Sequence, residues 1–152
     1  MDPMIFKNLL QKLFNPVSPN TASNPDFPKE GILWREWNDG TQKLIAERNR
    51  PVLFFVANPN PAVWPFLKAV LGAMPSNPKL RELLHDYYIA VMIKGDSIPE
   101  YFRDLGAGSR YNIAILSPAG LTPMTVINPI SGIPREIVTT ITKILEKLQE
   151  IY

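Results

Sequence analysis

The strongest constraint on the fold is one short apolar run, PVLFFVA, at residues 51–57. Proline begins the run and the stretch Asn-Pro-Asn-Pro at 58–61 ends it, so it is too short and too closely bounded for a helix. No residue after the first proline is polar, and a strand without a polar face has to be buried on both sides. The run therefore predicts a central strand in a sheet that helices cover on both faces.

Three more segments predict strands, at residues 89–93, 112–116 and 123–127. The turn-forming sequence Ser-Pro-Ala-Gly at 117–120 joins the last two into an antiparallel hairpin, whose second strand begins with a proline that suits a sheet edge. Apolar residues at helical spacing predict helices over 39–48, 64–73, 78–88, 98–105 and from 134 to the C-terminus. This order predicts an α/β fold with a central mixed sheet of four or five strands and helices on both faces.

Two details of these helices can be predicted from single residues. Asp39 stands near the start of the helix over 39–48 and is a possible cap. In the helix that begins at Pro78, the spacing places four apolar residues on the buried side, namely Leu80, Leu83, Leu84 and Tyr87.

The 152-residue chain divides into three parts. Residues 1–14 predict an amphipathic helix, residues 15–30 a proline-rich linker, and residues 31–152 the folded domain. We expect the helix to fold back onto the domain; in the alternative, it tethers a peripheral membrane or secretion-complex component. The chain contains neither a signal-peptide pattern nor an apolar run that could span a membrane, so we expect a cytoplasmic protein, or a periplasmic one if a leader has been removed.

Composition excludes several functions. The sequence has no cysteine, so disulfides, thiolate metal sites and thiol nucleophiles are impossible. Its only histidine, His85, cannot form a multi-histidine metal site, and a net charge of +2 is too small to favour nucleic acid. We expect His85, beside Asp86, to be a solvated helix residue, and we expect the same of the three nearby carboxylates Asp96, Glu100 and Asp104. No catalytic residue, metal or cofactor is predicted, and a non-thiol enzyme of unknown class stays as an alternative.

Four segments together resemble one family. Trp34-x-x-Trp37, a helix and then Arg50-Pro51 before the apolar strand are similar in spacing to the thioredoxin-like domain of spermatogenesis-associated proteins and of related bacterial proteins. The segments NPKLRELL (77–84), IKGD (93–96) and IAILSPAG (113–120) resemble later parts of that domain in the same register. The resemblance covers residues 31–152 and implies a thioredoxin-like fold.

The chain departs from this family where the family does its chemistry. The resemblance places the Cys-x-x-Cys motif on Pro61-Ala62-Val63-Trp64, so both thiol positions hold residues without a nucleophile. Tyr111 stands where thioredoxins have a cis-proline, and because a cis bond before a non-proline residue costs about 2.5–4 kcal/mol we expect a trans bond. The resemblance therefore implies a redox-inactive domain.

The former active site is the candidate binding surface. It lies beyond the carboxyl end of the central strand, where open α/β sheets bind their ligands, and it combines residue types that dominate interfaces. Its predicted members are Asn60, Pro61, Val63, Trp64, Arg110 and Tyr111. In the alternative, Trp64 only packs beneath its own helix. The predicted function is binding of a protein or peptide, as an adaptor, an assembly factor or a chaperone-like subunit.

Overall fold

The structure is a computed structural model that describes residues 31–127 and 133–151. The helix predicted over 1–14 and the linker predicted over 15–30 lie outside the described residues. The described elements are α2 (Asp39–Arg48), β1 (Val52–Ala57), α3 (Trp64–Ala73), the 3-10 turn η1 (Met74–Ser76), α4 (Pro78–Asp86), β2 (Ile89–Lys94), α5 (Glu100–Asp104), β3 (Ile113–Leu116), β4 (Pro123–Ile127) and α6 (Pro134–Ile151). Apart from η1, which the sequence analysis did not predict, their order and types are those predicted from the sequence.

The four strands form one mixed sheet in the order β2-β1-β3-β4. β1 pairs parallel with β2 and antiparallel with β3, and β3 pairs antiparallel with β4 as the predicted hairpin requires. A single parallel bridge extends the sheet beyond β2: the Arg35 amide donates to the Ala90 carbonyl (2.9 Å), and the Met92 amide donates to the Arg35 carbonyl (3.0 Å). The prediction of a mixed α/β sheet is confirmed, with four full strands.

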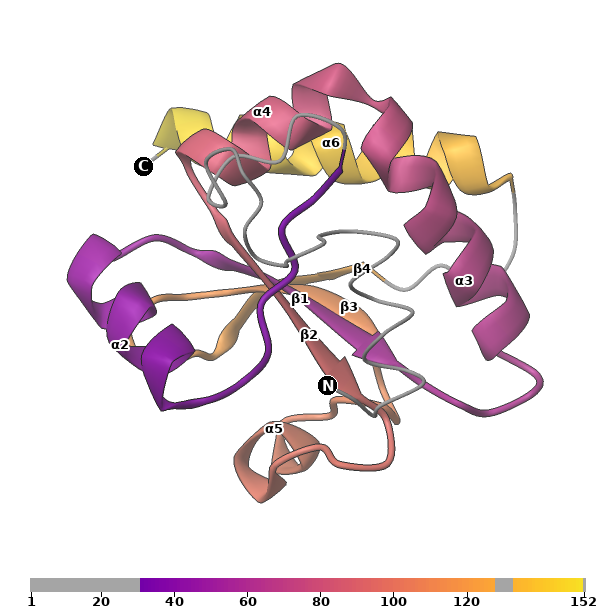
Figure 1. The fold of residues 1–152 in the computed structure, drawn as a ribbon, viewed down its shortest axis with the longest axis horizontal. Helices are drawn as coiled ribbons and strands as arrows, with labels where there is room; N and C mark the ends of the chain where they lie inside the picture. The colour runs from indigo at the N-terminus through magenta and orange to yellow at the C-terminus, as the bar shows by residue number, and fades with distance from the viewer. Residues whose placement is uncertain (1–30, 128–132, 152) are drawn as a thin grey trace.

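Side chains of β1 alternate between two cores, one on each face of the sheet. Leu53 and Phe55 join the cluster beneath α3, α4 and α6, whereas Phe54 and Val56 join the cluster beneath α2 and α5. Figure 1 shows α4 and α6 lying together on one side of the strands, with α5 on the other. All six residues of β1 are buried, which confirms the prediction from its apolar run.

Asparagine side chains begin two of the helices. The Asn38 side chain accepts a hydrogen bond from the Thr41 amide (2.8 Å), and the Asn77 side chain accepts one from the Leu80 amide (3.0 Å). Each therefore satisfies an amide that the first helical turn leaves without a partner. Asp39 is the first helical residue of α2, so its prediction as the cap was wrong by one position.

The end of α4 corrects a second prediction. The helix stops at Asp86, so the helical spacing does not extend to Tyr87, whose side chain is 44% exposed. The chain then turns into β2 and buries Tyr88, whose hydroxyl donates to the Leu145 carbonyl of α6 (2.7 Å). Tyr88 thus takes the place in the core that the sequence assigned to Tyr87.

The C-terminal helix α6 is the longest described element and is amphipathic. Its buried residues Val138, Ile141 and Leu145 recur at spacings of three and four and pack in the same cluster as α3 and α4. Neither α6 nor any other helix in the described part of the chain is long and apolar enough to cross a membrane.

Candidate functional site

The loop at residues 58–63 connects β1 to α3 and is fixed by two asparagines. The Asn58 side-chain oxygen accepts a hydrogen bond from the Asn60 amide (3.0 Å), and the Asn60 side-chain oxygen accepts one from the Ala62 amide (2.9 Å). The Asn60 carbonyl also accepts from the amides of Val63 (2.9 Å) and Trp64 (2.8 Å). These bonds set the direction in which the chain enters α3, where Pro65 occupies the first turn.

Asn58 also joins this loop to the one before β3. Its side-chain nitrogen donates to the Gly108 carbonyl (3.2 Å) and to the Asn112 side-chain oxygen (3.1 Å). A third segment, after β2, is held nearby because the Gly95 amide donates to the Ala57 carbonyl (2.9 Å). Three loops that follow or precede different strands therefore meet at the carboxyl end of β1.

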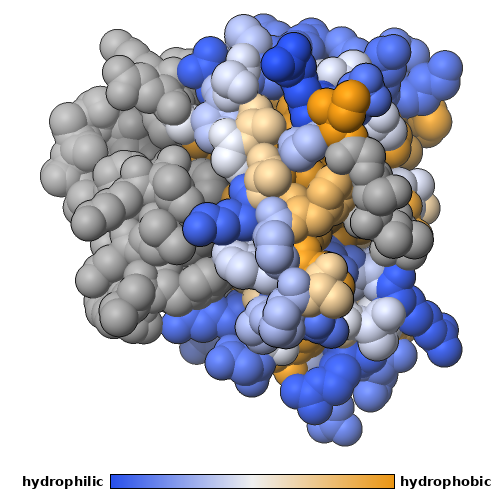
Figure 2. All heavy atoms as spheres, turned by 90° about the vertical axis from the view of Figure 1, so that its right-hand side faces the viewer, coloured by the Kyte–Doolittle hydropathy of each residue, from blue (hydrophilic) through white to orange (hydrophobic). Residues whose placement is uncertain are grey.

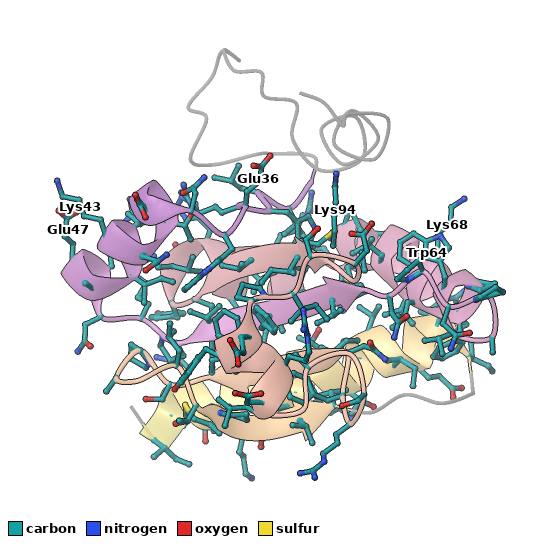
Figure 3. The ribbon with its side chains drawn as sticks, turned by 90° about the horizontal axis from the view of Figure 1, so that it is seen from below. Glu36, Lys43, Glu47, Trp64, Lys68 and Lys94 are labelled. Atoms are coloured by element: carbon teal, nitrogen blue, oxygen red, sulfur yellow. The ribbon has the colours of Figure 1, made fainter. Side chains whose placement is uncertain are left out.

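Five of the six predicted surface residues lie at this end of the molecule, and each of them is exposed or half-buried. Asn60, Pro61 and Arg110 are exposed, whereas Val63 and Trp64 are half-buried and contact the core cluster beneath α3. The Trp64 ring therefore packs beneath its helix and also keeps part of its surface open. Figure 3 shows it at one end of the molecule beside Lys68.

Tyr111 does not belong to this surface, contrary to the prediction. Its side chain is 2% exposed and lies in the core cluster beneath α2 and α5, 6.5 Å from the Phe54 ring between centroids. Glycines explain the turn that buries it: Gly106 and Gly108 have φ values of +106° and +84°, and the Tyr111 amide donates to the Gly106 carbonyl (3.2 Å). Every peptide bond among the described residues is trans, including the one before Tyr111, as expected.

The Tyr111 hydroxyl has no hydrogen-bond partner among the described residues. Burial raises its pKa above the ordinary value near 10, because the charged phenolate is poorly solvated in the core. Tyr111 therefore contributes packing and no contact to a ligand at the surface.

The sequence reasoning missed a larger feature, the exposed side of α3. We call this the α3 face and define it by the exposed residues Pro61, Ala62, Pro65, Lys68, Ala69 and Gly72. Lys68 is its only charged residue. Figure 2 shows this side of the molecule, where apolar and near-neutral residues gather in a central band. The segment WPFLKAVLGA contains one charge in ten residues, and this signal was available in the sequence.

The exposed side of α2 shows what a solvated helix of this protein looks like. Its exposed residues include Asp39, Gln42, Lys43, Glu47 and Arg48. Figure 3 shows Lys43 and Glu47 at the end of the molecule away from Trp64. Because a surface helix normally carries charged and polar residues on its outer side, the α3 face is atypical for a surface in contact with water.

The other candidate groups do not gather at the α3 face. Asp96, Glu100 and Asp104 are exposed as expected, and no three histidine or acidic residues within the described ranges are placed to hold a metal ion. His85, expected to be a solvated helix residue, lies on α4 with 34% of its side-chain surface exposed. Its Nδ1 lies 2.7 Å from Asp86 Oδ1.

In comparisons with known proteins, no family model matches the chain and no curated protein is significantly similar to it in sequence. The function therefore has to be argued from the geometry of the site.

Proposed function

We propose that this protein is a redox-inactive, thioredoxin-like domain that binds a protein or peptide partner through the α3 face. The strand order β2-β1-β3-β4, with one parallel and two antiparallel pairings and helices on both faces, supports the fold that the sequence resemblance implies. In place of the family's two thiols the chain has Pro61 and Trp64, so the site offers surface for contact and no sulfur for exchange.

The observation that carries the proposal is the exposed, nearly uncharged side of α3. The side chains of proline, alanine and glycine form no hydrogen bonds with water. Covering a surface made of them therefore costs little desolvation free energy. Lys68 is its single charge, so a partner rich in charged side chains would leave them unpaired after binding. We infer an apolar partner segment, with the exposed edge of Trp64 as an anchor at the rim.

The loop before α3 makes such binding more favourable. Hydrogen bonds from Asn58 and Asn60 already fix the positions of Pro61 and Ala62, so little conformational freedom is lost when a partner covers them. Binding is favoured over catalysis because Lys68 is the only titratable side chain on the α3 face, and a single ammonium group offers no acid–base pair.

The proposal is tested by placing one charge on the α3 face. Ala69→Glu puts a carboxylate at an exposed position of α3, and Ala46→Glu does the same at an exposed position of α2. The full-length tagged protein and both variants are used to capture partners from the native host, with quantification by mass spectrometry. We expect Ala69→Glu to reduce recovery of the captured partner at least tenfold, roughly, because an apolar partner segment would have to desolvate the new carboxylate. We expect Ala46→Glu to leave recovery unchanged.

A second variant examines the anchor. Trp64→Ala removes the half-buried ring, so the free energy of unfolding is measured beside the capture to separate folding from binding. Capture of the same partners in wild-type amounts by both Ala69→Glu and Trp64→Ala would reject the α3 face as the binding surface.

A further inference from the structure

The strand β4 forms one edge of the sheet. It pairs with β3 on its inner side, and no other residue within 31–127 and 133–151 forms a bridge to it. The opposite edge differs, because the Arg35 backbone bonds to Ala90 and Met92 on the outer side of β2. Among the described residues, β4 is therefore the edge that can accept another strand.

The pairing of the strands determines which backbone groups of β4 point outward. Just before β3, the Val56 amide donates to the Asn112 carbonyl (2.7 Å), so these two residues face each other as a hydrogen-bonded pair. Such pairs alternate along an antiparallel ladder, so Ala114 also directs its amide and carbonyl toward β1. The partner of Ala114 on β4 is Val126. The Val126 amide and carbonyl therefore point away from β3, toward the open side of the sheet.

Charged residues do not protect this edge. Folded proteins discourage the pairing of edge strands with lysine or other charged side chains, with proline, or with a bulge. β4 has proline only at its first residue, and the irregularity in its pairing, between Ile115 and Leu116, lies at that same end. No residue from 111 to 134 is charged, although one residue in five of the whole chain is. The later part of β4 is thus left without these protections.

Val126 also presents an apolar side chain at this edge. It is 49% exposed. As the partner of Ala114, it lies on the face of the sheet that α2 and α5 cover. A branched apolar side chain on a strand is stabilised by packing against another one directly opposite on a neighbouring strand. An added strand would therefore satisfy the outward backbone groups of Val126 and also cover its side chain.

We propose that β4 pairs antiparallel with β4 of a second copy of this chain, about a two-fold axis that passes beside Val126. The two Val126 residues exchange amide–carbonyl hydrogen bonds and pack their side chains together, so the two sheets become one.

The absence of charge selects this occupant. In a two-fold pairing, a residue on the axis meets its own counterpart, so a charge there would face a like charge. β4 has no charge, which makes it compatible with itself and gives a charged peptide no counter-charge. No residue of the α3 face lies on β4, so this proposal does not depend on the proposed function.

The test is the mass of the full-length protein in solution, measured by light scattering across about a hundredfold range of protein concentration. We expect a dimer at the upper end of the range. A monomer at every concentration would overturn the proposal. Hydrogen exchange at the Val126 amide then identifies the reason: slow exchange in a monomer would show that another segment of the chain, such as residues 1–30, covers the edge.

Two matched variants locate the interface. Val126→Lys places like charges opposite each other at the axis, so we expect the dissociation constant of the dimer to rise about tenfold or more. Ala46→Lys adds the same charge at an exposed position of α2 and should dimerise as the wild type does. Circular dichroism checks that both variants are folded. A dimer that Val126→Lys leaves intact, or that both variants weaken equally, would also overturn the proposal.

Discussion

Two buried tyrosines differ in what their hydroxyl groups meet. The Tyr88 hydroxyl donates to the Leu145 carbonyl at 2.7 Å, whereas the Tyr111 hydroxyl has no partner among the described residues. A buried hydrogen bond contributes about 0.5–1.5 kcal/mol, but a buried polar group without a partner costs about 1–3 kcal/mol. The same chemical change at the two positions should therefore have opposite effects.

We expect Tyr88→Phe to lower the free energy of unfolding by about 1–2 kcal/mol, since it removes the bond to α6. We expect Tyr111→Phe to leave that free energy unchanged or to raise it by up to about 1 kcal/mol, since it removes only a desolvated hydroxyl. Urea denaturation of both variants and the wild type measures the difference. A loss of stability in Tyr111→Phe as large as that in Tyr88→Phe would mean that the Tyr111 hydroxyl has a partner.

Tyr111 should also make stability depend on alkaline pH. Burial raises the pKa of its hydroxyl above the ordinary value near 10, so the folded protein holds this proton more tightly than the unfolded chain does. Its contribution is fully present below pH 10 and is lost as the pH rises through the raised pKa. The measurement is the free energy of unfolding between pH 9 and 11, where Tyr111→Phe should reduce the loss. The exposed Tyr87→Phe is the control and should show the wild-type loss.

At the scale of the elements, two glycines distinguish a crowded loop from an open helix surface. A Cβ atom at Gly95 would lie 2.5 Å from Pro59 Cδ, 2.8 Å from Asn58 Cα and 2.9 Å from the Ala57 carbonyl oxygen. A Cβ atom at Gly72, within α3, would meet nothing within 4 Å. We expect Gly95→Ala to cost about 1–3 kcal/mol of stability, because backbone atoms have to move.

The matched change Gly72→Ala should instead raise the free energy of unfolding by about 0.5–1 kcal/mol, because alanine loses less conformational freedom in a helix than glycine does. Thermal or urea unfolding of the two variants gives both values. Equal effects of the two substitutions would contradict the close approach of the loop after β2 to the loop after β1.

Asn58 joins the loop before α3 to the loop before β3, and replacing it should loosen both of these loops. We expect Asn58→Ala to lower stability by about 1–3 kcal/mol, since it leaves the Asn60 amide and the Gly108 carbonyl without their side-chain partner. Hydrogen exchange should become faster at the Asn60 amide in particular. The exposed Ser109→Ala is the control; unchanged exchange at Asn60 in Asn58→Ala would contradict this role.

The elements could be predicted from the sequence because local signals mark them clearly. Proline and asparagine bound the apolar run of β1, and Pro65 and Pro78 lie in the first turns of α3 and α4. Burial of single side chains was harder to predict, because it depends on where a helix stops and how a loop turns. The predicted burial of Tyr87 was wrong because α4 ends one residue earlier, at Asp86. The predicted surface position of Tyr111 was wrong because two glycines turn the chain so that its side chain enters the core.

The α3 face could have been found from the sequence, yet its members were not all identified. The resemblance directed attention to the four residues at 61–64, where the family has its thiols. The outer residues of α3, such as Ala69 and Gly72, belong to no motif. They become part of a candidate binding surface because α3 buries its other side, with Leu67, Val70 and Leu71, and leaves theirs exposed. Exposure is a property of the packed molecule.

On the scale of the whole molecule, the two ends of the sheet differ in charge. The end that follows β1 presents the nearly uncharged α3 face, while the amino end of β2 has a pocket lined by three arginines. The chain as a whole carries a net charge of only +2. Its uneven surface therefore reflects how the fold distributes these residues.

We propose that the α3 face is the surface that contacts the partner, and the absence of cysteine from the chain allows a direct test. Ala69→Cys and Ala46→Cys each introduce the only thiol, at matched exposed positions on α3 and α2. Both variants are labelled with a benzophenone reagent, returned to the native host extract and illuminated. We expect a discrete protein adduct from Ala69→Cys, which Ala62→Glu abolishes in the same chain, and none from Ala46→Cys. Equal adduct yields from the two positions, or no adduct from Ala69→Cys, would contradict it.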